Sequence, residues 1–254
     1  MRTINYNRVR INTEDDLVIR PIGDLHIGHQ NCDEEFIKET LEELNNFSDH
    51  RILLMGDLID CGTKGSVGGS AYEQTLSPND QLNYLVDMFE PFKDRIDGCV
   101  MGNHEYRIYR ECGVDITEQF CKQLSIPYFL YSGVVTYSIG INGRERAYNI
   151  NMIHGKCGGG VENALRSCKA MSNKATADVY LMGHCHHNAH TTRTMKYVDS
   201  RNGKLVDGAQ HFVLTGHALN YDDSYADQAN LEISVKGFPV IIMSGTGKKE
   251  IEVN

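Results

Sequence analysis

Side chains that can bind metal ions or transfer protons follow apolar runs at five places in the 254-residue chain. Each run ends beside a glycine, a pattern typical of buried strands that deliver functional groups at their carboxyl ends. The residues concerned are Asp24, His26, Asp57, Asn103, His104, His154, His184 and His186. Oxygen and imidazole donors without thiolates are typical ligands of Mn²⁺, Fe, Zn²⁺ or Ni²⁺. One metal ion cannot use so many groups, so the sequence predicts a two-metal centre, which suits an in-line displacement at phosphorus.

The spacing within the motifs predicts how these side chains point. Asp24 and His26, like His184 and His186, are separated by one residue, and alternate residues of an extended segment face the same side. His104 directly follows Asn103, so an extended segment would turn its side chain away from its neighbour. A histidine with a pKa near 6.5 can donate a proton at neutral pH.

The elements that must position these residues follow from hydrophobic periodicity and turn signals. Strands are expected at 17–23, at 51–56, in a run that ends at 102, at 177–183 and within 231–253. Helices are expected after Asp33, after Ser77, at 116–124 and at 161–173. Strands and helices alternate in the first part of the chain, and the later part is mostly strands. Hairpins are expected to turn at Asn142-Gly143 and Asn202-Gly203. Pro21 indicates that its strand lies at an edge or ends early. The order predicts two sheets packed face to face with helices outside, and one domain spanning 1–254, because no linker interrupts it.

A Gly/Ser-rich stretch at 62–77 begins a few residues after Asp57. One hypothesis is that it borders the substrate and orders over a nucleotide, with Tyr72 stacking on a base and Lys64 near a phosphate. The other is a solvated loop or a subunit contact. The sequence leaves both open.

Composition limits the partners and the compartment. A net charge of −9 argues against a broad basic surface for long duplex DNA, although a local cationic site remains compatible with it. The chain shows no signal-peptide pattern and no apolar run of about 18 residues, so we expect a cytoplasmic protein without a membrane partner. Eight cysteines without Cys-x-x-Cys spacing predict reduced thiols, with a structural zinc as the lesser alternative.

The five motifs occur in an order that resembles a known superfamily. They are Gly-Asp-Leu-His (23–26), Gly-Asp-Leu-Ile-Asp (56–60), Gly-Asn-His-Glu (102–105), His-Gly (154–155) and Gly-His-Cys-His (183–186). Together they resemble the calcineurin-like metallophosphoesterase superfamily. The resemblance implies an α/β fold, a four-layer αββα sandwich of two mixed β-sheets with flanking helices, and a dinuclear metal centre whose bound hydroxide attacks a phosphoester.

The resemblance also implies a role for each motif residue. One metal is held by Asp24, His26 and His186, and the other by Asn103, His154 and His184. Asp57 bridges the two metals. His104 is implied to contact the phosphate and to protonate the leaving oxygen. Mn²⁺ is the favoured metal, with Fe, Zn²⁺ or Ni²⁺ as alternatives.

One departure from the family pattern bears on the substrate. Phosphoprotein phosphatases carry Arg where this chain has Cys61, and Asp-Leu-His-Ile-Gly (24–28) is more similar to the nuclease and small phosphodiesterase branches. We therefore expect a phosphodiesterase acting on a nucleotide or a nucleic-acid end. The alternatives are a phosphomonoesterase, a non-enzymatic scaffold and a mononuclear hydrolase of another fold. The sequence does not predict the oligomeric state.

Residues beside the motifs have weaker expectations. Glu105 is expected to support the loop or to accept the second N–H of a ligand, and Asp60 either orients a ligand histidine or caps a turn. Candidate phosphate contacts are Arg107, Arg110 and Lys156. The histidines outside the motifs are expected to be surface or core residues: His29, His50, His187, His190, His211 and His217. The favoured exceptions are His29 and His187, because each lies just past a motif.

Overall fold

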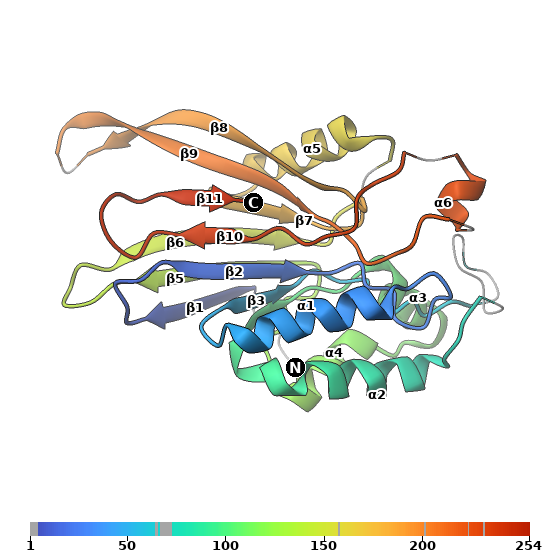
Figure 1. Ribbon diagram of the computed structural model, residues 1–254. Helices are drawn as coiled ribbons and strands as arrows, with labels where there is room; N and C mark the ends of the chain where they lie inside the picture. The colour runs from blue at the N-terminus through green and yellow to red at the C-terminus, as the bar shows by residue number, and fades with distance from the viewer. Residues whose placement is uncertain are drawn as a thin grey trace.

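The computed structural model describes residues 5–63, 66, 73–156, 158–200, 202–222, 224–230 and 232–254. Two mixed β-sheets pack face to face, and helices cover their outer faces (Figure 1). This confirms the expected αββα arrangement. Lys64 and Tyr72 lie outside the described residues, so the hypothesis that they bind a nucleotide stays a prediction.

The five-stranded sheet has the order β11-β10-β2-β3-β4. Its strands are β2 (Leu17–Ile22), β3 (Arg51–Leu54), β4 (Ile96–Cys99), β10 (Ile241–Met243) and β11 (Ile251–Val253). Strands β2, β3 and β4 run parallel, so their carboxyl ends meet at one edge. Of the two expectations for Pro21, the edge strand is wrong, because β2 is the middle strand; β2 does end at Ile22, one residue after Pro21 and one residue before the expected end. Proline is tolerated there because the ladder between β2 and β10 stops at Ile19, two residues earlier.

The six-stranded sheet has the order β1-β5-β6-β7-β9-β8. Its strands are β1 (Tyr6–Ile11), β5 (Ser132–Ile139), β6 (Arg146–Ile153), β7 (Val179–Met182), β8 (Asn188–Asp199) and β9 (Lys204–Thr215). The two hairpins predicted from Asn-Gly turns are confirmed as the antiparallel pairs β5–β6 and β8–β9. Strand β1 was not expected from the sequence; it is an edge strand that pairs with β5 in parallel.

Helices α1, α2 and α4 cover the five-stranded sheet, and α5 covers the six-stranded sheet (Figure 1). The helices are α1 (Glu34–Asn46), α2 (Pro78–Phe89), α3 (Asn103–Cys112), α4 (Ile116–Leu124), α5 (Val161–Ala170) and α6 (Tyr225–Gln228), with 3₁₀ turns η1 (Glu90–Arg95) and η2 (Met171–Asn173). The expected N-caps are confirmed, since Asp33 accepts the N–H of Phe36 and Ser77 that of Asp80.

Apolar side chains form three clusters that follow the layers. One lies between the sheets and includes the fully buried Tyr137 and Tyr148, and the others lie under the helices on each outer face. Clusters on both faces of each sheet fix the strands, and with them the residues at their carboxyl ends. No helix among the described residues is long and apolar enough to span a membrane.

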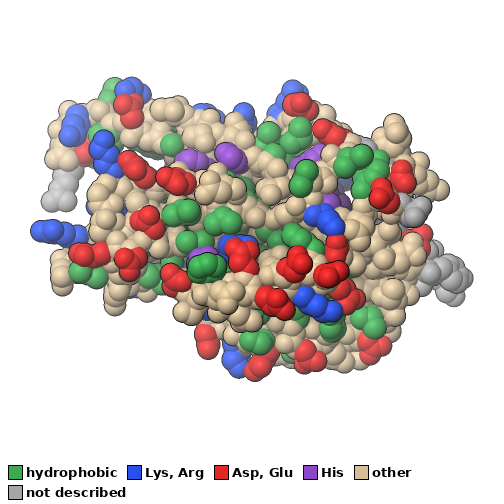
Figure 2. Space-filling model, in the orientation of Figure 1, with side chains coloured by type: hydrophobic (Ala, Val, Ile, Leu, Met, Phe, Trp, Pro, Cys, Tyr) green, Lys and Arg blue, Asp and Glu red, His purple; other side chains and the backbone are tan. Residues whose placement is uncertain are grey.

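The surface and the thiols test two further expectations. Figure 2 shows acidic side chains spread over the lower half of this face, where α1 and α2 lie, and no broad basic patch among the residues drawn in colour there. Among the described cysteines, six are free: Cys32, Cys61, Cys99, Cys112, Cys121 and Cys168. Cys185 is disulfide-bonded, so the expectation of reduced thiols is wrong at this residue. The absence of Cys-x-x-Cys spacing does not exclude a disulfide, because the fold can bring together cysteines that are distant in the sequence.

Candidate metal centre

The candidate ligands converge where the strands end. Asp24 follows β2, Asp57 follows β3, and Asn103 stands shortly after β4, at the start of α3. His154 follows β6, and both His184 and His186 follow β7. These carboxyl ends lie at the right-hand side of the two sheets in Figure 1. The described side chains form three possible donor groups: two consist of predicted ligands alone, and the third, His26, Asp60 and His104, shares His26 with one of them. The structure therefore brings all seven predicted ligands together.

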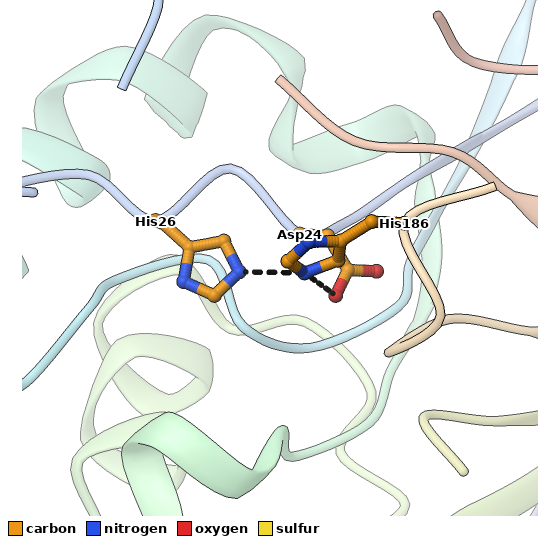
Figure 3. Close-up of side chains that lie close together, drawn as sticks. All are labelled: Asp24, His26 and His186. Carbon is orange, nitrogen blue, oxygen red and sulfur yellow. Dashed lines mark hydrogen bonds and ion pairs between the residues drawn. The ribbon is translucent and has the colours of Figure 1, made fainter. Parts of the chain in front are cut away.

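The first group consists of Asp24, His26 and His186 (Figure 3). The Nε2 atoms of His26 and His186 face each other at 3.1 Å, and His186 Nε2 lies 3.3 Å from Asp24 Oδ1. Asp24 is fully buried, and the backbone N–H of His184 donates to both of its carboxylate oxygens. This group can hold one cation with one carboxylate and two imidazoles.

The second group consists of Asp57, His154 and His184. Asn103 joins it, because its Oδ1 lies 3.0 Å from His154 Nε2. Asp57 Oδ2 is 3.2 Å from His154 Nε2 and 3.9 Å from His26 Nε2, which belongs to the first group. One carboxylate oxygen thus stands between the two donor groups, as a bridging ligand must.

The backbone at these motifs is not extended as expected. Asp24, His26, Asp57, His184 and His186 have φ values of 49°, 52°, 48°, 68° and 52°, in the left-handed region. Such residues each cost about 1–3 kcal/mol and persist only where the surroundings over-determine them. Hydrogen bonds to the neighbouring motif supply this constraint, since the N–H groups of Asp24 and His26 donate to the carbonyls of Gly56 and Asp57. Asp24 and His26, like His184 and His186, therefore face one side because both members of the pair have left-handed backbone angles, and not because they alternate along a strand.

Gly102 lets two motifs approach closely. A Cβ at this position would lie 2.1 Å from both the backbone N and Oδ1 of Asp57. Only glycine allows the end of β4 to pass this close to Asp57, so Gly102 and Asp57 are packed as one unit.

Asp60 orients two histidines, which decides between its two predicted roles. Its Oδ1 lies 3.0 Å from Nδ1 of His26 and 2.9 Å from Nδ1 of His104. These contacts fix Nδ1 as the protonated nitrogen of each ring and leave Nε2 to face the centre. The two histidines hold the pKa of Asp60 well below its usual range, against the effect of its burial.

His104 lies on helix α3 and not on an extended segment. Its N–H donates to Asp57 Oδ1 at 2.8 Å, and its Nε2 lies 3.8 Å from Asp57 Oδ2. Burial lowers the pKa of His104, but Asp57 and Asp60 outweigh burial and raise the pKa above its ordinary value. Arg107 donates to Nε2 at 3.0 Å, which is possible only while that nitrogen carries no proton.

Glu105 supports the loop that carries Asp57, which confirms the first of its two predicted roles. Its carboxylate accepts the backbone N–H groups of Asp57, Leu58, Ile59 and Gly102. Burial raises its pKa to about 7, and Asp57 adds to this effect.

Replacing Glu105 with alanine should destabilise the fold. The Glu105→Ala variant leaves four backbone donors without their acceptor, and each buried donor left unpaired costs about 1–3 kcal/mol. We therefore expect the free energy of unfolding, measured by urea titration, to fall by at least about 3 kcal/mol. Glu111→Ala on the exposed end of the same helix is the matched control and should change it by less than about 0.5 kcal/mol. Equal stability of the two variants would contradict a supporting role.

The structure adds His217 to this cluster. Its ring stacks on His186 with centroids 5.4 Å apart, and it is 6% exposed. Nδ1 accepts the N–H of Leu219, which leaves the proton on Nε2, and Nε2 has no hydrogen-bond partner among the described residues. Burial, followed by His186, lowers its pKa to about 4.

The signal was present in the sequence, because an apolar run and Gly216 precede His217 as in four of the five motifs. The favoured exceptions His29 and His187 are not members of the donor groups that the described residues form.

The residues present fit two divalent cations. Asp24 and Asp57 are buried carboxylates whose ion-pair partners, within the described ranges, are histidines alone. Burial lowers the pKa of His154, but the carboxylates of Asp57 and Asp24 outweigh burial and raise it to about 10. The proton on the His154 ring then offsets the negative charge of the two carboxylates, which a bound cation would otherwise offset. Facing Nε2 atoms and buried carboxylates without Lys or Arg partners are the donor set of a transition-metal site.

Similar solved structures include Vps29 complexed with Zn²⁺ from Entamoeba histolytica, at 14% identity and a TM-score of 0.40 over 93% of this chain and 98% of that one. A second is a predicted phosphoesterase from Streptococcus pneumoniae TIGR4, at 10% identity and a TM-score of 0.39 over 94% of this chain and 97% of that one. A third is the calcineurin-like phosphoesterase YfkN from Bacillus subtilis, at 11% identity and a TM-score of 0.38 over 95% of this chain and 91% of that one. No curated protein matches the chain. The family model for calcineurin-like phosphoesterases matches residues 19–229, which include all five motifs, and the chain therefore belongs to the calcineurin-like phosphoesterase family.

Proposed function

We propose that this protein hydrolyses phosphodiester bonds of a nucleotide or of a nucleic-acid end, using two divalent metal ions. Family membership supports a phosphoester hydrolase. The observation that carries the proposal is the position of Asp57 Oδ2, 3.2 Å from a histidine of one donor group and 3.9 Å from a histidine of the other. A shared carboxylate is the geometry that a dinuclear site needs.

The residues divide between two cations. Asp24, His26 and His186 would hold one, Asn103, His154 and His184 the other, and Asp57 both. When bound, the two cations polarise the phosphoryl oxygens and lower the pKa of a water that attacks phosphorus. Mn²⁺ suits this mixture of oxygen and imidazole donors, as do Fe, Zn²⁺ and Ni²⁺.

His104 is the proposed proton donor to the leaving oxygen. Asp60 fixes its Nδ1, so the proton to be transferred sits on Nε2 at the edge of the centre. Arg107 must leave Nε2 for this proton to be present. A phosphate oxygen is the natural alternative acceptor for the guanidinium, so substrate binding would place Arg107 on the anion and leave Nε2 to carry its proton.

Preference for a diester rests on the surroundings of the second motif. The position after Asp60 carries Cys61, which is buried and whose thiol pKa is raised by burial, so it offers no charge to a phosphate. A monoester dianion requires more positive charge than a diester monoanion. The centre therefore favours the singly charged substrate.

Hydrolysis of bis-p-nitrophenyl phosphate and of p-nitrophenyl phosphate tests this proposal. Removing metals with a chelator should abolish both reactions, and Mn²⁺ should restore hydrolysis with the larger kcat/KM for the diester. Full activity in the metal-free protein would exclude the metal mechanism. A larger kcat/KM for the monoester would favour the alternative phosphomonoesterase.

A further inference from the structure

Three tyrosines form an exposed cluster beside the metal centre. Tyr106 and Tyr109 stack with ring centroids 5.8 Å apart, and Tyr131 meets Tyr106 edge to face at 6.2 Å. Tyr109 is 46% exposed and Tyr131 52% exposed. We call Tyr106, Tyr109 and Tyr131 the tyrosine cluster.

The core does not account for this cluster. The three apolar clusters that the described residues form include none of the three tyrosines. The buried residues of α3 are His104 and Glu105, both in its first turn. The rest of this helix is partly or fully exposed and carries two aromatic rings, while Ile108 packs against the apolar cluster under the helices. Exposed aromatic rings gathered in one place are typical of a surface that binds a partner or ligand.

Helix geometry places the tyrosine cluster next to the reacting phosphate. Asn103, whose Oδ1 contacts His154, is the first residue of α3. Tyr106 follows one turn later, about 4.5 Å along the axis, and Tyr109 about 9 Å along it. Residues three and four apart lie on one side of a helix, so Tyr106 and Arg107 flank the face that Asn103 turns to the centre.

Positive charge lies on the same helix as two of the rings. Arg107 contacts His104, and Arg110 follows one turn later on the exposed part of α3. A candidate metal centre, two guanidinium groups and stackable rings along one helix are the kinds of group that bind the phosphate and the base of a nucleotide. Grooves for single-stranded nucleic acid combine the same elements.

We propose that the tyrosine cluster is a base-stacking subsite for a nucleobase next to the scissile phosphate, on a single-stranded nucleic-acid end or a nucleotide. This inference rests on the proposed phosphodiesterase function. Every base has a π-face, so such a subsite accepts all four bases with little sequence preference. A short single-stranded end also suits a protein with a net charge of −9 better than a long duplex does.

Paired substrates with the same leaving group test the subsite. Thymidine 5′- and 3′-(p-nitrophenyl phosphate) carry a base, whereas methyl p-nitrophenyl phosphate does not. In the double variant Tyr109→Ala/Tyr131→Ala we expect KM for the better thymidine ester to rise by about fivefold to about 100-fold. KM for the methyl ester and kcat for both should stay unchanged.

Two controls separate stacking from general damage. Tyr109→Phe/Tyr131→Phe keeps the rings and should keep the KM of the wild type. Phe47→Ala removes a ring that is 45% exposed just beyond α1, at the opposite end of the sheet from the centre, and should change neither KM. An unchanged KM for the thymidine esters in the alanine double variant would overturn the subsite.

A binding measurement distinguishes failure of the subsite from failure of the proposed function. Fluorescence anisotropy of a labelled oligothymidylate with the Mn²⁺-loaded protein does not require hydrolysis. We expect the alanine double variant to bind it at least about fivefold more weakly than the wild type. If the wild type hydrolysed only monoesters yet bound the oligonucleotide through the tyrosines, the diesterase proposal would fail and the subsite would stand. Equal binding by both proteins would overturn the subsite alone.

Discussion

In the Asp57→Asn variant, we expect metal occupancy and hydrolysis to be lost together. Asp57 Oδ2 stands between the two donor groups, so the substitution removes one negative ligand from both cations. Loss of a group that only supports a ligand already costs about 10- to 100-fold in metal affinity. Loss of the shared ligand should therefore lower Mn²⁺ affinity by more than about 100-fold, as measured by isothermal titration calorimetry on metal-free protein.

Asp97→Asn is the matched control for Asp57→Asn. Asp97 is also buried, but it pairs with Arg51 near the start of β4, at the opposite end of the strand from the centre. Its replacement should lower stability and leave the number of bound Mn²⁺ ions unchanged. An Asp57→Asn protein that bound two Mn²⁺ ions as tightly as the wild type would exclude the bridging role.

The His104→Ala variant should keep its metals and lose rate. If His104 protonates the leaving oxygen, kcat should fall by about 10²–10⁴-fold for a substrate with an alkoxide leaving group. The loss should be much smaller for p-nitrophenolate, which leaves without a proton. The measurement is kcat for a series of diesters with leaving groups of increasing pKa, together with Mn²⁺ binding.

His211→Ala serves as the control for this series. His211 is a buried histidine on β9 that contacts Thr192 and lies outside the donor groups of the described residues. Its replacement should leave the dependence on leaving-group pKa as in the wild type. An equal loss of rate across all leaving groups in His104→Ala would show that His104 positions the phosphate and does not donate the proton.

The sequence predicted the convergence of the ligands because two local signals coincide. An apolar run specifies a buried strand, and a glycine beside Asp, Asn or His marks where it ends. Parallel strands place those ends at one edge without further information. The eight strand-end residues could therefore be named before their distances were known, and the resemblance to the family implied which seven of them are ligands.

Local conformation at the ligands could not be predicted in the same way. Asp24 and His186 adopt left-handed backbone angles that only contacts between motifs enforce, and these contacts are remote in sequence. Asn103 begins a helix because Glu105 in its first turn binds backbone groups around Asp57, a tertiary effect. Strand β1 escaped notice because its alternating exposed residues give a weak apolar signal at an edge. Cooperation between distant segments explains each of these differences.

The number of metal ions per chain tests the central claim most directly. Metal-free wild-type protein dialysed to equilibrium against Mn²⁺ should contain two ions per chain, as measured by inductively coupled plasma mass spectrometry. The predicted ligands form two donor groups with Asp57 Oδ2 between them, so we expect both groups to bind Mn²⁺ at saturation. One ion per chain at saturation, or none, would contradict a dinuclear centre at the ends of these strands.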